Sequence, residues 1–191
     1  MDTWVWIVIA VAAVVVLASI AWYVRNERRR RELQERLGPE YDRTVAEAPT
    51  RREAESELRE RVERREELEI RPLSEQARTR YVQAWEAAQA RFVDDPEGAI
   101  GEADELIQSA MRERGYPVED FEQRSADLSV DYPHVVEHYR EGHGIARRSI
   151  RGEADTESLR QAMVHYRALF AELVGADTGG TDADARVGAS T

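Results

Sequence analysis

Residues 4–24 read WVWIVIAVAAVVVLASIAWYV, and this stretch contains no charged residue, no Gly and no Pro. As a helix it would be about 31 Å long, close to the thickness of the hydrocarbon core of a bilayer. The stretch therefore predicts a transmembrane anchor over residues 1–24. The rest of the chain would then be a domain held at one face of the membrane.

The two ends of this stretch support the same interpretation. Trp4 and Trp6 lie at one end and Trp22 and Tyr23 at the other, as is typical of the amphipathic aromatic rings at membrane interfaces. Five arginines follow: Arg25, Arg28, Arg29, Arg30 and Arg31. Because positive charge is retained on the cytoplasmic side, we expect the N-terminus outside and residues 25–191 in the cytoplasm of a single-pass protein at the cell membrane. The same arginines could also form a specific site for anionic lipid.

A cleaved signal peptide is the alternative to an anchor. Such a peptide has a basic segment before a shorter apolar core and a cleavage site with small residues. Here Asp2 precedes the apolar stretch, the stretch is long, and the arginines come after it. These features favour an uncleaved anchor.

Composition excludes several kinds of chemistry. The chain has no Cys, so it has no disulfide, thiolate metal site or thiol nucleophile. All 27 basic residues are Arg, which excludes a lysine Schiff base and a P-loop lysine. Residues 81–191 hold 11 Arg against 22 acidic residues, the reverse of the basic face of a nucleic-acid-binding module. We therefore expect a protein partner or self-association, and no nucleic acid.

Apolar periodicity and capping residues predict an all-α fold, with a charged juxtamembrane region and a small helical bundle. The helices are expected over residues 25–37 (continuing the anchor), 40–47, 51–69, 75–91, 96–114, 118–128, 133–150 and 157–174. Thr50, Ser74, Asp95 and Thr156 are expected as N-terminal caps. The predicted organisation is an anchor over 1–24, charged juxtamembrane and spacer helices over 25–71, a bundle over 72–175 and a disordered tail over 176–191.

The expected helix over 51–69 is unusually charged, since 14 of its 19 residues are Arg or Glu. Its apolar residues form only a thin stripe: Ala54, Leu58, Val62 and Leu68. A mostly solvated spacer helix fits this pattern best. A coiled-coil seam is the alternative, although arginines interrupt its heptad register.

Large apolar residues on the inner faces of the bundle helices are the expected core: Trp85, Phe92, Leu106, Phe170 and Leu173. Gly142 and Gly144 lie within the helix expected over 133–150, and each lowers helix stability by roughly 1 kcal/mol. A kink is therefore expected near them.

One short pattern has a catalytic counterpart. His134, Glu137 and His138 form an H-x-x-E-H sequence, in which two histidines one helical turn apart could bind zinc while the glutamate activates water. The context disfavours this interpretation, because the pattern is short and lies in a small helical domain. We therefore expect no catalytic, cofactor-binding or metal site, and these three residues are only weak candidates for metal ligands.

Four stretches together resemble a family of bacterial, largely actinobacterial, membrane-anchored helical proteins of unknown function: LQERLGPEYDRTV, RFVDDPEGAIGEADELI, RGYPVEDFEQRSADLSVDYPHVVEHYR and LRQAMVHYRALFAELV. The resemblance covers most of residues 33–174. It implies an anchor and a helical domain, and it implies no activity, ligand or site residue.

The function expected from the sequence is a membrane-tethered helical interaction or scaffold protein without catalytic activity. Two alternatives stay open. One is a zinc-dependent hydrolase using residues 134–138, and the other is a structural or envelope-stress protein acting at the lipid surface. Residues 4–24 are the expected contact with the bilayer.

Overall fold

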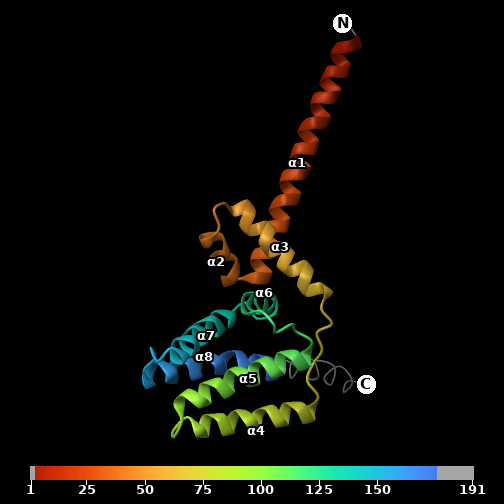
Figure 1. The fold of residues 1–191 in the computed structure, drawn as a ribbon. Helices are drawn as coiled ribbons and strands as arrows, with labels where there is room; N and C mark the ends of the chain where they lie inside the picture. Colours follow the sequence, from red (N-terminus) through yellow and green to blue (C-terminus); the bar gives the residue numbers. More distant parts are fainter. Residues whose placement is uncertain (1–2, 176–191) are drawn as a thin grey trace, which may run out of the picture. The chain divides into compact units, whose positions relative to one another are not determined.

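The structure is a computed structural model that describes residues 3–175, with side chains at all of these positions except 3, 5–11 and 13. The described residues form eight α-helices and no strand (Figure 1). An all-α fold was therefore correctly predicted. The predicted tail over 176–191 lies outside the described residues.

The predicted transmembrane anchor is wrong on the described part of the chain, where no helix is long and apolar enough to cross a membrane. The helix α1 runs over Thr3–Leu37, and its side chains are described without interruption only from Val14. The predicted single-pass placement, with the N-terminus outside and a cytoplasmic C-terminal domain, is wrong for the same reason.

The chain groups into two compact units that meet within α3, the first being Met1–Arg59 and the second beginning at Glu60. The first unit holds α1, α2 (Pro39–Glu47) and most of α3 (Arg51–Glu67). Gly38 lies between α1 and α2 with a φ of 45°, a left-handed conformation that suits glycine. The Tyr41 hydroxyl donates a hydrogen bond to Glu55 at 3.0 Å, which joins α2 to α3. The thin apolar stripe of α3 is real, since Ala54 and Leu58 are both fully buried, while the coiled-coil alternative stays a prediction.

The second unit is a bundle built around its last helix. The α8 helix (Thr156–Gly175) packs against α7 (Val136–Ile150), α5 (Pro96–Arg114) and α4 (Glu75–Arg91), and α6 (Phe121–Asp131) packs on α7. In Figure 1, α4, α5 and α8 run side by side with α7 above them. A helical bundle was correctly predicted.

Capping residues set most helix ends in this bundle. Ser74 accepts a hydrogen bond from the Ala77 N–H at the start of α4, and Asp95 accepts one from Gly98 at the start of α5, as predicted. The prediction for α8 was wrong by one residue, because the side chain of Asp155, and not that of Thr156, accepts from the Ser158 N–H. The observed α6 begins at Phe121 because Asp120 caps it by accepting from Gln123.

The expected core residues divide into two groups. Trp85, Phe170 and Leu173 are buried as predicted, whereas Phe92 and Leu106 are only partly buried against the core. Trp85 on α4 stacks on Phe170 of α8, with ring centroids 4.5 Å apart and an interplanar angle of 17°. This stacking holds the first helix of the bundle against the last.

A segment before α4 is also attached to the bundle. Within the second unit, Arg65 donates to Asp131 of α6 at 2.5 Å, and the Tyr116 hydroxyl donates to the same carboxylate. The Arg71 N–H donates to the Arg114 carbonyl at 2.9 Å, and a Cβ at Gly115 would lie 2.5 Å from the Glu69 carbonyl oxygen. Residues 60–71 therefore contact the bundle closely, while the predicted domain limits themselves stay a prediction.

We expect Trp85→Ala to lower the free energy of unfolding by about 3–5 kcal/mol, because it removes a buried aromatic ring and the face on which Phe170 stacks. Urea denaturation is the measurement. Val82→Ala is the matched control on the same helix, since Val82 is exposed and its truncation should change stability by less than about 0.5 kcal/mol. A loss below about 1 kcal/mol for Trp85→Ala would contradict the packing described here.

A second expectation concerns the segment before α4. A fragment covering 72–175 should be less stable than one covering 60–175 by about 3 kcal/mol, because it leaves Asp131 without Arg65 and uncovers apolar contacts of Leu68 and Ile70. Parallel urea titrations of the two fragments give the difference. Equal stability would show that the bundle begins at residue 72, as the sequence predicts.

Candidate functional site

The residues of the H-x-x-E-H pattern do not come together as a zinc site would require. The α7 helix begins at Val136, so His134 precedes it and the two histidines do not share a helical face. The Val135 and Val136 N–H groups both donate to the Tyr132 carbonyl at 3.1 Å, which forms a turn where the sequence predicted helix. The Glu137 side chain pairs with Arg140 at 3.1 Å. The interpretation as a catalytic zinc motif therefore loses its geometric basis.

The residues predicted at the membrane interfaces are mostly exposed. Trp4, Trp22 and Tyr23 each expose more than half of their surface, and the side chain of Trp6 lies outside the described residues. Arg25, Arg28, Arg29 and Arg31 are exposed, while Arg30 is half-buried and pairs with Glu27 at 3.5 Å. The interfacial role predicted for these residues depends on a membrane span, and no described helix provides one.

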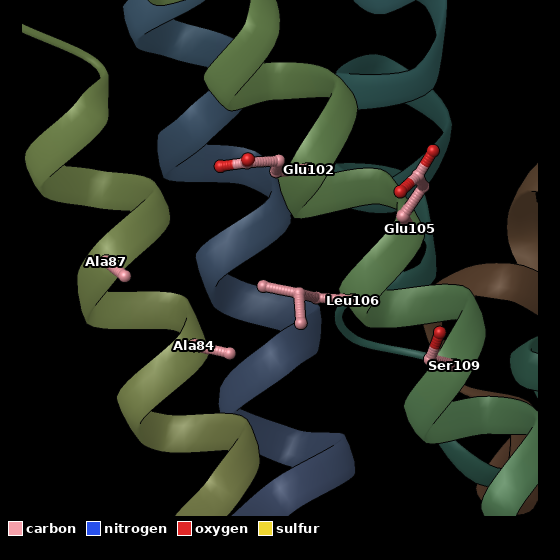
Figure 2. Close-up of a pocket in the computed structure, with 6 residues that line it drawn as sticks. All are labelled: Ala84, Ala87, Glu102, Glu105, Leu106 and Ser109. Carbon is pink, nitrogen blue, oxygen red and sulfur yellow. The ribbon is translucent and has the colours of Figure 1, made fainter.

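A surface groove lies between α4 and α5 of the bundle. Its volume is about 370 Å³, and it is lined by Ala84, Ala87, Glu102, Glu105, Leu106 and Ser109. In Figure 2, Leu106 reaches from α5 toward α4, and Ala84 and Ala87 point back across the groove. Small side chains on α4 therefore leave room above a leucine that the core only partly covers.

The rim of this groove is acidic. Glu102 forms an ion pair with Arg91 at the end of α4. Asp95 forms a second ion pair with the same arginine, with an N–O distance of 2.8 Å. Glu105 is exposed and makes no hydrogen bond or ion pair with any residue of the described chain. The groove thus combines an apolar floor with a carboxylate that is available to an incoming cation.

The opposite face of α5 carries a partly buried polar cluster. Asp104 accepts a hydrogen bond from the Gln108 amide at 2.6 Å and faces His143 of α7 with an Oδ1–Nδ1 distance of 3.9 Å. The fully buried tyrosines Tyr139 and Tyr166 lie in the same region, their rings 6.1 Å apart. Phe121 stacks on the His143 imidazole at 3.8 Å and fixes its plane. This cluster links α5, α7 and α8.

Burial and charge act in opposite directions on Asp104. Desolvation raises the pKa of its carboxyl, but His143 and Tyr166 stabilise the carboxylate, and the net effect lowers the pKa below the usual 3.8. Burial raises the pKa of Tyr166, and the neighbouring Asp104 carboxylate raises it further. The Tyr166 hydroxyl is close enough to influence Asp104, although it completes no hydrogen bond with a described residue. The cluster is therefore an ionised aspartate held among neutral tyrosines.

Sequence reasoning missed this cluster and the groove. Asp104 and Gln108 are one turn apart on α5, but His143 and Tyr166 join them only across helices. In the same way, His165 on α8 lies beside His138 on α7, although the two residues are far apart in the sequence. Only the register between packed helices could have revealed these pairs.

Comparison with known proteins adds no function. No protein-family profile, curated protein sequence or solved structure is detectably similar to the chain. The resemblance to an actinobacterial membrane-anchored family stays a prediction.

We expect Asp104→Asn to lower the free energy of unfolding at pH 7 by about 1–3 kcal/mol, because it removes the charge from a partly buried polar network. A carboxylate with a lowered pKa contributes stability above its ordinary pKa and loses it as the pH falls through the folded pKa. The difference between wild type and variant should therefore shrink as the pH falls below 3.8.

Urea denaturation at several pH values between 7 and 3 measures this dependence. Glu105→Gln is the matched control on the same helix, since Glu105 is exposed and unpaired in the described chain. A difference that stays constant down to the lowest pH would contradict the assignment of an ionised Asp104.

Proposed function

We propose that the protein is a helical interaction module that binds a basic amphipathic helix of a protein partner in the groove between α4 and α5. The observation that carries this proposal is the combination of an apolar floor at Leu106 with an unpaired Glu105 at the rim. The proposal includes no catalytic activity of the chain itself.

The shape of the groove favours a helix as its occupant. Ala84 and Ala87 on α4 and Ser109 on α5 are small, and small residues along a groove let the ridge of a third helix approach closely. Peptides that bind in this mode present apolar residues at helical spacing to a hydrophobic groove. Leu106 is the natural anchor point, because its side chain is only partly covered by the core.

Charge favours a basic partner. Residues 81–191 hold 11 Arg against 22 acidic residues, and two of those acids lie at the groove. An arginine or lysine flanking the apolar ridge of the partner would pair with Glu105. Such rim charges mainly raise the association rate and make binding sensitive to salt.

The test uses a synthetic helical peptide with a Leu/Ala ridge and flanking arginines, titrated into the full chain and followed by NMR chemical shifts and calorimetry. A second peptide keeps the ridge and replaces every arginine by glutamate. We expect the arginine peptide to bind in the groove, with the largest shifts at residues 84, 87, 106 and 109, and the glutamate peptide to bind at least tenfold more weakly.

Ala87→Arg should weaken binding of the arginine peptide at least tenfold, or about 1.4 kcal/mol, because it fills the groove and adds a repelling charge. Ala90→Arg is the matched control, since Ala90 is exposed on the same helix and does not line the groove. Equal weakening by both variants, shifts elsewhere on the bundle, or no binding at millimolar peptide would each contradict the proposal.

A further inference from the structure

Three metal-ligating side chains gather on the outer side of the contact between α7 and α8. His138 and Glu141 lie one turn apart on α7, and His165 lies on α8. Each offers one donor atom, and the three atoms lie within 4.8 Å of one another. Among the described residues this is the group of three that could hold an ion, and it includes neither His134 nor Glu137.

The separations between the donor atoms match those around a tetrahedral ion. The Nδ1 atoms of His138 and His165 are 3.1 Å apart, and a Glu141 carboxylate oxygen is 3.2 Å from the second imidazole and 3.7 Å from the first. In a tetrahedral site with bonds of about 2.0–2.1 Å, ligand atoms lie about 3.3–3.4 Å from one another. The three atoms therefore already form one face of such a tetrahedron.

Helix packing accounts for this closeness. Gly142 follows Glu141 on α7, and a Cβ in its place would lie 2.8 Å from the Tyr166 ring and 3.4 Å from the Cβ of His165. The absence of a side chain at Gly142 lets α7 approach α8 closely enough for the two imidazoles to meet. The glycine that allows α7 to pack against α8 therefore also brings the three ligands together.

The exposure and the donor atoms of the three side chains together indicate which ion they would bind. About half of the His138 and Glu141 side chains is accessible to solvent, against 23% for His165, so an ion could enter directly and complete its shell with water. Two imidazoles and one carboxylate suit Zn²⁺ and its neighbours in the transition series better than Mg²⁺ or Ca²⁺, which prefer oxygen ligands.

We propose that His138, Glu141 and His165 bind one divalent transition-metal ion of the zinc type, which joins α7 to α8 on the surface of the bundle. Binding exchanges one hydrogen bond between imidazoles for coordinate bonds that cross between the two helices. Because the folded chain holds the three ligands together and the unfolded chain does not, binding stabilises the fold.

Tag-free full-length protein is titrated with ZnCl₂ by calorimetry, and thermal unfolding is followed with and without the ion. We expect one ion per chain, and a rise in Tm of about 5–10 °C when free Zn²⁺ exceeds the Kd about a hundredfold. MgCl₂ at the same concentration should produce no such rise.

Substitutions identify the ligands. His138→Ala and His165→Ala should each weaken Zn²⁺ binding at least tenfold and abolish the rise in Tm. Both variants should keep the helical circular dichroism of the wild type, since neither imidazole is fully buried. His134→Ala is the matched control, because it removes a neighbouring histidine of the H-x-x-E-H pattern and should leave binding unchanged.

Three results would overturn the proposal. They are the absence of Zn²⁺ binding at millimolar concentration, unchanged binding in both ligand variants, and loss of binding in His134→Ala. If one of the alanine variants fails to fold, His165→Gln is measured in its place, since it also removes a ligand of the site. Unchanged Zn²⁺ affinity in His165→Gln would equally count against the site.

Discussion

The close approach of α7 to α8 at Gly142 is the contact on which most of the bundle depends. A Cβ at this position would lie 2.8 and 2.9 Å from two ring atoms of Tyr166, a side chain that is fully buried and has no room to move. Interiors of proteins are packed too densely to absorb such a clash without shifting a helix. Since α8 also contacts α4 and α5, a shift there would reach every helix of the core.

Two groups of polar side chains follow from this one contact. On the inner side, the approach brings His143 of α7 and Tyr166 of α8 to the partly buried Asp104 of α5. On the outer side, it brings His138 and Glu141 to His165. The inner group holds α5 in place, and α5 in turn supplies Leu106 and Glu105 to the groove on its other face. The proposed partner site, the proposed metal site and the cluster around Asp104 are thus consequences of the same packing.

Local signals in the sequence predict the helices well and the sites poorly. The bounds of α4 and α5 match the predicted 75–91 and 96–114, because Ser74, Asp95 with Pro96, and Gly115 are strong start and stop signals. The prediction failed for the first residues of α7, where Pro133 begins a turn that periodicity cannot distinguish from helix. It also failed for the anchor, because the apolar composition of residues 4–24 predicts a span while no described helix is long and apolar enough to cross a membrane. The pairs His138–His165 and Asp104–His143 were beyond prediction, because spacing relates residues within a helix and says nothing about the register between helices.

Substitution of the two glycines of α7 tests the central contact most directly. Gly142 meets Tyr166, whereas the nearest atom to a Cβ at Gly144 is the flexible end of Arg148 at 3.9 Å. From helix propensity alone, both alanine variants would be more stable than the wild type by up to about 1 kcal/mol. The packing described here predicts opposite signs in the free energy of unfolding measured by urea denaturation. Gly144→Ala should stabilise the protein, and Gly142→Ala should destabilise it by about 1–3 kcal/mol. Stabilisation by both substitutions would contradict the close contact between α7 and α8.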